Sequence, residues 1–342
     1  MIKGVFMRIK WFVNDSHACG FVRGEMIARA VNRDHAPHTM DCKTAIWPSD
    51  YFQTDVMVFQ RASDYIHLQC MYKAQDAGVK VIYELDDDLF QVPLSFGPSG
   101  ERFSRHPVRE TIKRFLKDAD AVTVSTPFLG QQMRRHTSKP MYVVGNGVDV
   151  DHWQREVPGK EHLTIGWMAS GTHKQDAPII KEALVRVMAQ HPEVHITLIG
   201  FPDLRDLAGL EPFADRVNIA GWQGSEQLPE YMSYFDIGLA PLVDTPFNKS
   251  KSGIKAMQYW ANRTPVVCSP LPPYDLVTDR ENGLFANSPD EWYSALCSLV
   301  EDDTLRKSLG ENGLATLLRE HEMKVIVKDW LGVFQSLITG GE

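Results

Sequence analysis

Short apolar runs alternate along this chain with longer amphipathic segments of helical period, from about residue 8 to residue 319. The short runs predict buried β-strands, and the amphipathic segments between them predict helices that cover the strands. Repeated strand and helix units of this kind wind a parallel sheet with helices on both of its faces. The pattern therefore predicts an α/β protein.

The predicted strands form two series. The first series lies at residues 8–13, 56–59, 79–85, 121–125 and 141–144, and the second at 164–168, 195–199, 217–219, 237–240 and 265–268, with 284–285 as a sixth member. The predicted helices lie between and after them, at 24–31, 66–77, 108–119, 177–190, 228–234, 253–262, 289–301, 304–319 and 323–337. Two series of this length predict two doubly wound domains.

The length of the chain agrees with two domains, because 342 residues exceed the ~250–300 at which single cores stop growing. Residues 149–161 are polar and contain Pro158 and Gly159, which is typical of a linker. We therefore expect domains at 1–155 and 156–322. The amphipathic segment within 323–342 follows the end of the second domain, and we expect it to return and pack on the first.

Composition and charge limit where the protein is expected to be found and which partners it is expected to bind. The net charge is -8 and no Lys/Arg-rich run is present, so nothing favours long-range attraction to a polyanion, although a nucleic-acid partner stays open. The five cysteines are widely separated and never form C-x-x-C, which indicates reduced thiols. The start lacks the features of a secretory signal, and no apolar stretch approaches the ~20 residues that span a bilayer. We expect a cytoplasmic protein.

The first candidate site lies in TPFNKSKSGIKAMQYWANRTPVV, residues 245–267. Lys251 and Lys255 are four residues apart and are expected to share one helix face, with Lys249 and Ser252 where the helix begins. A helix N-terminus offers free N–H groups and the positive end of the dipole, so added lysines suit a diphosphate. The alternative is a solvated basic helix start.

A second candidate site is the loop in IGWMASGTHKQD, residues 165–176, between a predicted strand and helix. Gly171 permits close backbone approach, and Ser170, Thr172 and Lys174 offer donors to phosphate oxygens. The alternative is an ordinary loop with a surface lysine.

Asp86, Asp87 and Asp88 follow a predicted strand of the first domain. Clustered carboxylates coordinate Mg²⁺ or Mn²⁺ in many proteins, but we favour binding of ligand hydroxyls or a structural role, with no metal. His106 and His173 fall in predicted loops. We expect the side chains of Trp167, Trp222 and Trp260 to pack the cores.

The run at 245–267 resembles the carboxyl-terminal signature of the retaining glycosyltransferase family 4, which contains a lysine-bearing helix followed by a turn and P-V-V. Further strings occur in the family's order: KVIYELDDDLF (80–90), DAVTVST (120–126), NGVD (146–149), AGWQ (220–223), YFDIGLAPL (234–242) and ENGLF (281–285). The resemblance covers nearly the whole chain from Lys80 onward. It implies the GT-B fold, in which two Rossmann-like, doubly wound parallel-sheet domains face each other across a cleft.

The resemblance also implies roles for particular residues. Many family members carry two glutamates where this chain has Gln258 and Ser250; Gln258 is still able to bind a donor ribose hydroxyl, whereas Ser250 cannot replace a carboxylate's charge. The loop at 14–26 in the family lies close to the donor phosphates and the acceptor, which nominates Gly20 and Arg23. The other residues expected to bind the acceptor or to face the cleft are Asp86, Asp87, Asp88 and His106. The residues expected to stabilise the leaving diphosphate are Lys174, Lys251 and Lys255.

The implied reaction moves a sugar, with retention, from a nucleotide sugar such as a UDP-, GDP- or ADP-sugar to an acceptor hydroxyl. No cofactor or metal is expected. The acceptor stays open among a saccharide, a lipid and a hydroxymethylated DNA base, since this short form resembles phage-encoded transferases, which act in the host cytoplasm. The alternatives are a nucleotide-sugar 2-epimerase of the same fold and a binding-only protein that has lost catalysis. A dehydrogenase is disfavoured because the first strand is not followed by G-x-G-x-x-G.

Overall fold

The computed structural model describes residues 6–14, 18–156, 159–169, 173–200 and 209–340. The chain forms two compact units. The first unit contains Met1–Gly147, Lys249–Ser252 and Met323–Glu342, and the second contains Val148–Asn248 and Gly253–Glu322. The division after Gly147 comes eight residues before the boundary expected at 155, and α14 (Met323–Thr339) is counted with the first unit.

The first unit is built on a six-stranded parallel sheet in the order β2-β1-β3-β4-β5-β6. Its strands are β1 (Arg8–Phe12), β2 (Thr39–Lys43), β3 (Val56–Gln60), β4 (Lys80–Leu85), β5 (Ala121–Val124) and β6 (Met141–Val143). The order reverses between β1 and β3. Strands β3, β4 and β5 are buried almost throughout, because helices cover both faces of the sheet.

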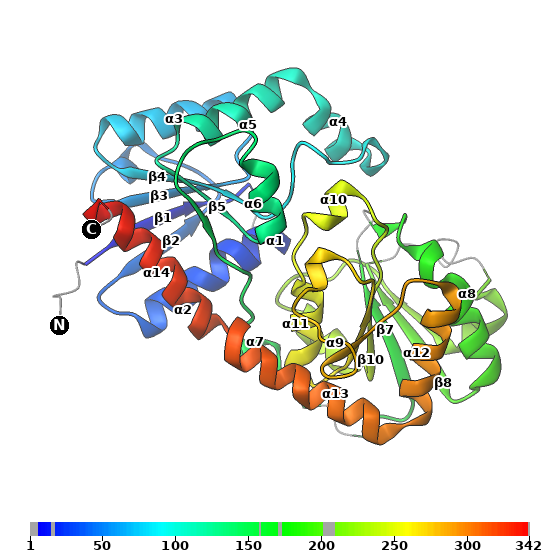
Figure 1. The fold of residues 1–342 in the computed structure, drawn as a ribbon. Helices are drawn as coiled ribbons and strands as arrows, with labels where there is room; N and C mark the ends of the chain where they lie inside the picture. Colours follow the sequence, from blue (N-terminus) through cyan, green and yellow to red (C-terminus); the bar gives the residue numbers. More distant parts are fainter. Residues whose placement is uncertain (1–5, 15–17, 157–158, 170–172, 201–208, 341–342) are drawn as a thin grey trace. The chain divides into compact units, whose positions relative to one another are not determined.

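Two helical layers cover the sheet of the first unit (Figure 1). One layer contains α3 (Tyr65–Asp76) and α5 (His106–Asp118), which bury Met71, Phe115 and their neighbours against β3 and β4. The other contains α2 (Met26–Asp34) and α14, whose Trp330 packs edge-on against Trp11 of β1 at 4.7 Å. Shorter segments complete the unit: α1 (Ala18–Gly20), η1 (Phe21–Glu25), η2 (Pro48–Tyr51), η3 (Leu94–Phe96), α4 (Pro98–Ser104) and α6 (Pro127–Met133).

The second unit repeats the design with a six-stranded parallel sheet in the order β12-β11-β10-β7-β8-β9. Its strands are β7 (Leu163–Met168), β8 (Val194–Ile199), β9 (Val217–Ala220), β10 (Ile237–Ala240), β11 (Val266–Cys268) and β12 (Gly283–Phe285). The order reverses between β7 and β10. In an open sheet of this kind, ligands bind beyond the carboxyl ends of the strands at the reversal point.

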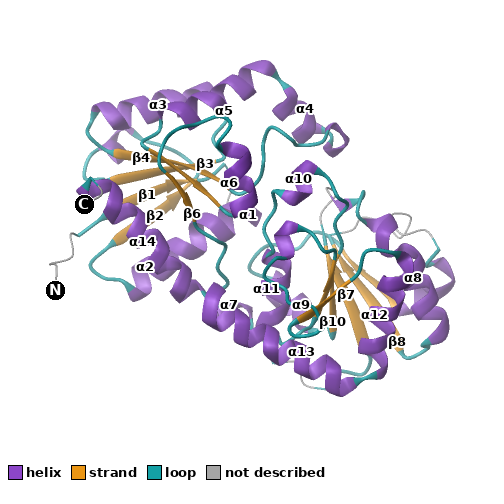
Figure 2. Cartoon of the chain, viewed as in Figure 1, coloured by secondary structure: helices purple, strands orange, loops and turns teal. Residues whose placement is uncertain are grey.

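Helices also cover both faces of the second sheet (Figure 2). One core contains α8 (Ala177–Gln190) and α12 (Pro289–Glu301), and the other contains α9 (Leu228–Ser233), α11 (Ile254–Ala261) and α13 (Asp303–Thr316). Glycine lets α13 approach α11 closely, because a Cβ at Gly313 would collide with the indole of Trp260. The remaining segments are α7 (Val150–Trp153), η6 (Glu211–Arg216), α10 (Pro246–Lys249), η7 (Pro272–Tyr274) and η8 (Leu317–His321).

The predicted α/β class and the two doubly wound parallel sheets are confirmed, but each sheet has six strands. The sequence missed β2, an edge strand in which only Met40 is buried. The expected packing role of Trp222 is wrong, because 60% of that residue is exposed, whereas Trp167 and Trp260 are buried as expected. No helix in the described part of the chain is both long and apolar enough to cross a membrane.

Candidate functional site

In the second unit, Lys255 lies in the first turn of α11 and contacts a buried histidine. Its Nζ is 2.9 Å from Nε2 of His173, and Nδ1 of His173 is 2.7 Å from Oδ2 of Asp176. A lysine ammonium only donates, so His173 accepts through Nε2 and donates from Nδ1 to Asp176. Neither His173 nor Asp176 is more than 6% exposed. The lysine is therefore held at the helix start by a fixed polar chain.

The backbone of the second unit builds this polar chain. Asp176 receives hydrogen bonds on Oδ1 from the backbone N–H of Val243 at 2.8 Å and from Nδ2 of Asn248 at 3.1 Å. Helix α11 begins directly after Gly253, where a Cβ would collide with Leu276 and with the carbonyl of Pro273. Only glycine allows this close approach, which fixes the point where Lys255 enters the helix.

Gln258 follows Lys255 by three residues on α11, so the two side chains share one helix face. Gln258 is only 4% exposed, and within the described residues its Oε1 accepts no hydrogen bond. A buried polar atom without a partner is costly, and in native structures it commonly marks a place for water or a ligand. Helix α11 thus presents a cation and an unsatisfied acceptor one turn apart.

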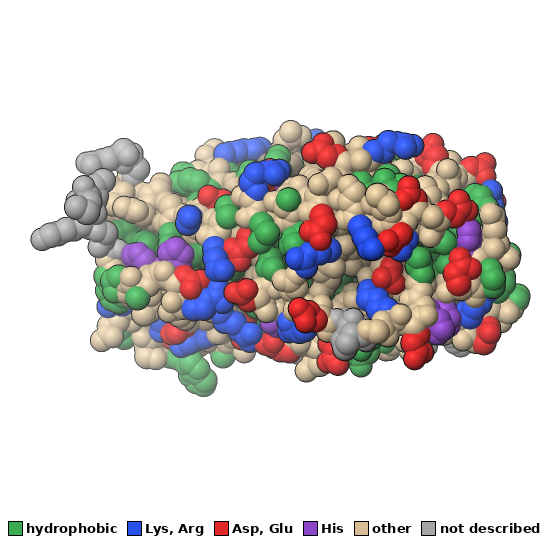
Figure 3. Space-filling view, turned by 90° about the horizontal axis from the view of Figure 1, so that it is seen from below, with side chains coloured by type: hydrophobic (Ala, Val, Ile, Leu, Met, Phe, Trp, Pro, Cys, Tyr) green, Lys and Arg blue, Asp and Glu red, His purple; other side chains and the backbone are tan. Residues whose placement is uncertain are grey.

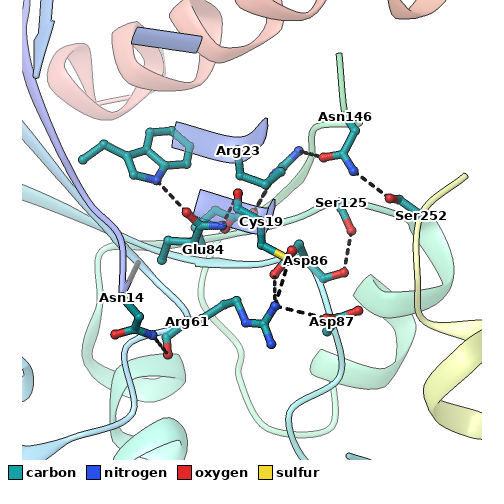
Figure 4. A network of polar contacts seen from close by, with 12 residues as sticks. Asn14, Cys19, Arg23, Arg61, Glu84, Asp86, Asp87, Ser125, Asn146 and Ser252 are labelled. Carbon is teal, nitrogen blue, oxygen red and sulfur yellow. Dashed lines mark hydrogen bonds and ion pairs between the residues drawn. The ribbon is translucent and has the colours of Figure 1, made fainter. Parts of the chain in front are cut away.

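In the first unit, Arg61 follows β3 and lies among three acceptor atoms (Figure 4). Its Nη1 is 3.1 Å from Sγ of Cys19, 3.1 Å from Oδ2 of Asp87 and 3.4 Å from Oδ1 of Asp86. Burial, reinforced by Asp86, raises the pKa of the Cys19 thiol well above its ordinary value. The thiol stays protonated, and the guanidinium balances the two carboxylates.

A cavity of about 270 Å³ opens beside Arg61 in the first unit. Gly20, at the end of α1, and the aromatic ring of Phe103 line it together with several polar side chains. The lining residues are Asn14, Cys19, Gly20, Gln60, Arg61, Ser99, Arg102 and Phe103. Amide and guanidinium groups supply hydrogen-bond donors, carboxylates lie close by, and one aromatic ring is present. This combination suits a small ligand that is rich in hydroxyl groups.

Arg23 lies in η1 and forms a buried network (Figure 4). It is 1% exposed, and its Nη2 is 2.7 Å from Oε1 of Glu84. Its Nη1 donates to the carbonyls of Val144 and Gly145 at 2.8 and 2.9 Å and to Oδ1 of Asn146 at 3.1 Å. The expectation that Arg23 lies in an open loop facing ligand is therefore corrected, because packing turns this arginine inward to hold β4 and the segment after β6.

Comparison with known proteins shows which proteins the chain is similar to. Residues 160–302 match the family model described as glycosyl transferases group 1. The matched residues make up most of the second unit. The match confirms the glycosyltransferase family and enzyme class predicted from the sequence.

Two curated relatives extend this glycosyltransferase match into the first unit. The chain is 25% identical over 284 residues to the putative teichuronic acid biosynthesis glycosyltransferase TuaH of Bacillus subtilis, covering 76% of this chain and 66% of the relative. It is 24% identical over 249 residues to the lipopolysaccharide core biosynthesis glycosyltransferase LpsE of Rhizobium meliloti, covering 69% of each. The chain thus spans about two thirds of both relatives.

The fold of this glycosyltransferase also matches solved structures. Anabaena Alr3699/HepE in complex with UDP-glucose superposes with a TM-score of 0.68 at 15% identity, covering 96% of this chain and 98% of that chain. The predicted GT-B fold is confirmed.

The predicted donor residues of the glycosyltransferase are distributed differently from the expectation. Lys251 and Ser252 do not share a helix face with Lys255, because α10 ends at Lys249 and α11 starts only at Ile254. Lys251 and Ser252 are counted with the first unit, where the Ser252 hydroxyl accepts a hydrogen bond from Nδ2 of Asn146 at 2.6 Å. Lys174 is exposed in a turn before α8. Ser170, Gly171 and Thr172 lie outside the described residues.

The predicted acceptor residues also separate. Gly20 lines the cavity, and Asp86 and Asp87 contact Arg61 beside it. Asp88 instead makes a local turn, in which Oδ1 accepts from the N–H of Phe90 at 2.9 Å. His106 is the first residue of α5 with its side chain 86% exposed, and it is not part of the cavity lining.

Sequence reasoning missed Arg61, Gln60 and Asp176. A signal for Arg61 existed: β3 and β4 are successive strands, and the residues that follow neighbouring parallel strands meet at one sheet edge. Asp176 had no comparable signal, since its partners Val243 and Asn248 lie more than sixty residues away.

Glu84 predicts a pH dependence of stability for this glycosyltransferase. Burial outweighs Arg23 and raises the pKa of Glu84 from 4.5 to about 7. Between these two values the folded protein holds the proton more tightly than the unfolded chain, so this group lowers stability as pH rises through that window. In urea unfolding, the wild type should lose stability between pH 4.5 and about pH 7, and the Glu84→Gln variant should lack this loss. Parallel pH profiles for the two proteins would contradict the assignment.

Proposed function

We propose that the protein transfers a glycosyl group from a nucleotide diphosphate sugar to a hydroxyl of a saccharide acceptor. Binding of the nucleotide-sugar donor is supported by two side chains of α11. Lys255 contacts His173, and the buried Oε1 of Gln258 accepts no hydrogen bond within the described residues. A cation at a helix start suits a diphosphate, and an amide oxygen one turn later suits a ribose hydroxyl.

The chemistry follows from the charge that develops in the transition state. As the bond to the anomeric carbon breaks, negative charge grows on the leaving diphosphate, and a fixed cation lowers the barrier by stabilising it. We assign Lys255 this role in the second unit, assisted by Lys174 in the turn before α8. Lys251 and Ser252 are counted with the first unit and take no part in this assignment.

A UDP-sugar is the donor that we favour. The Anabaena neighbour is described in complex with UDP-glucose and with UDP, and S. aureus TarM and pneumococcal GtfA, of the same fold, are described in complexes that contain UDP. We further propose retention of the anomeric configuration, with the acceptor hydroxyl attacking from the face that the diphosphate leaves and passing its proton to a phosphate oxygen. That route needs no separate side-chain base.

A saccharide acceptor fits the cavity of the first unit better than a nucleic acid. Arg61, Asn14 and Gln60 provide donors there, and Asp86 and Asp87 provide acceptors close by, as sugar hydroxyls require. The two curated relatives are named for teichuronic acid biosynthesis and for lipopolysaccharide core biosynthesis. On the face drawn in Figure 3, basic and acidic side chains are mixed, whereas nucleic-acid binding favours a continuous basic stripe.

The proposal is tested by a panel of UDP-, GDP- and ADP-sugars. We expect UDP-sugars to raise the melting temperature, since a ligand at 100 times its Kd adds about 2.7 kcal/mol of stability. Free UDP should then appear only with a saccharide acceptor, and turnover should persist in EDTA.

Three results would contradict the proposal. Interconversion of the donor to its 2-epimer without acceptor would identify an epimerase. Donor binding without turnover over any acceptor would identify a binding-only protein. No stabilisation by any nucleotide sugar would remove the donor site itself.

A further inference from the structure

Three side chains with different metal-binding atoms meet in the second unit where α8 ends. His191 directly follows α8, and Cys297 and Glu301 lie four residues apart on α12, so both project from one face of that helix. One ligand atom from each of the three lies within 4.8 Å of the others. The α8 and α12 helices pack together in one core, so the cluster bridges two neighbouring elements.

His191 is held in an orientation that leaves one nitrogen without a hydrogen bond. The residue is 8% exposed, and its Nδ1 is 3.4 Å from Oε1 of Glu193. Its Nε2 is buried and 3.5 Å from Oε1 of Glu301, yet within the described residues it makes no hydrogen bond. A buried imidazole nitrogen 3.5 Å from a carboxylate oxygen, without a hydrogen bond of its own, calls for a further partner.

We propose that His191, Cys297 and Glu301 bind a Zn²⁺ ion. Imidazole nitrogen, thiolate sulfur and carboxylate oxygen are the three ligand types that Zn²⁺ takes in proteins, and a fourth, tetrahedral position is left for water. Glu193 on Nδ1 supplies the carboxylate that commonly orients a zinc-bound histidine. The ion would join the end of α8 to α12.

The position in the fold separates this site from the donor residues. His191 lies three residues before β8, at the amino-terminal edge of the parallel sheet, whereas donor loops follow the strands at the opposite edge. The zinc site therefore serves stability and not the transfer reaction.

A second cluster of this kind among the described residues is a poorer metal site. Cys19, Asp86 and Asp87 also bring their ligand atoms within 4.8 Å of one another. The guanidinium of Arg61 already lies within 3.4 Å of all three. The Arg61 guanidinium occupies the place that a metal ion would take. Replacement of Cys19 is therefore a suitable control for replacement of Cys297.

Cobalt substitution of the full-length, EDTA-treated protein tests the proposal. One equivalent of Co²⁺ should give a thiolate-to-cobalt charge-transfer band together with visible bands of tetrahedral intensity. Cys297→Ser should abolish the charge-transfer band, and Cys19→Ser should keep it. Zn²⁺ should displace the cobalt and raise the melting temperature of the wild type.

Two substitutions at exposed glutamates test the proposal without disturbing the fold. Glu301→Gln, at a side chain 58% exposed, should weaken Zn²⁺ binding about tenfold or more while circular dichroism and transferase turnover stay unchanged. The matched variant Glu182→Gln, on α8 with its side chain 64% exposed, should bind like wild type. Absence of the charge-transfer band, its loss in Cys19→Ser, or equal affinity of Glu301→Gln and wild type would each overturn the proposal.

Discussion

Replacing Lys255 by alanine is expected to lower kcat for sugar transfer by about a hundredfold or more, because loss of one fixed group that stabilises developing charge typically costs that much. Lys255 enters at the first turn of α11, and its ammonium is held 2.9 Å from His173. The truncation removes the cation but leaves the buried pair of His173 and Asp176 in place, so the fold should survive. Release of UDP at saturating donor and acceptor measures the effect.

The matched control for this prediction is Lys307→Ala. Lys307 lies on α13 of the same unit, with its side chain 74% exposed and paired with Asp303. Its removal should leave kcat and donor affinity within twofold of wild type, on the order expected for an exposed pair. A Lys255→Ala enzyme that keeps full turnover would remove α11 from the proposed mechanism.

Replacing Arg23 by methionine is expected to destabilise the first unit by about 3–5 kcal/mol, the usual cost of leaving one buried charge without its partner. Arg23 and Glu84 are 1% and 0% exposed, so no water replaces the lost guanidinium. The carbonyls of Val144 and Gly145 would lose their donor as well. Urea unfolding above pH 7, where Glu84 is ionised, should show a lower midpoint.

Two further variants define what the Arg23 result means. Arg114→Met, on α5 with its side chain 61% exposed, removes an ion pair with Asp118 and should change stability by about 1 kcal/mol or less. Arg23→Met combined with Glu84→Leu should recover part of the loss, since an apolar pair of similar volume replaces the buried ions. Equal midpoints for Arg23→Met and Arg114→Met would show that the buried network contributes little.

The sequence located most elements of the fold because buried parallel strands have a strong local signature. Strands β3, β4 and β5 are apolar runs, buried almost completely on both faces. Edge strand β2 escaped because one face and one edge of TMDCK meet solvent, so no apolar run marks it. Trp222 shows the converse: its apolar character predicted burial, but it follows β9, an edge strand, and remains exposed.

The candidate site could be predicted only in part. Lys255 and Gln258 followed from spacing on one helix and from the family resemblance. Their partners did not, because His173 and Asp176 lie about eighty residues earlier and meet α11 only through the order of strands in the sheet. Likewise, the spacing of four residues predicted that Lys251 and Lys255 share one helix face. They do not, because α10 ends at Lys249 and α11 begins only at Ile254.

The sequence by itself determined the α/β class, the two parallel sheets, the glycosyltransferase family and the helix that carries Lys255, because each of these depends on residues close together along the chain. Only the tertiary structure decided that Arg23 is buried, that Arg61 lies between Cys19 and Asp87, and that His191 faces Cys297 and Glu301. These facts depend on which strands are neighbours and which helix ends meet. Long-range packing sets such neighbours, and no local pattern encodes them.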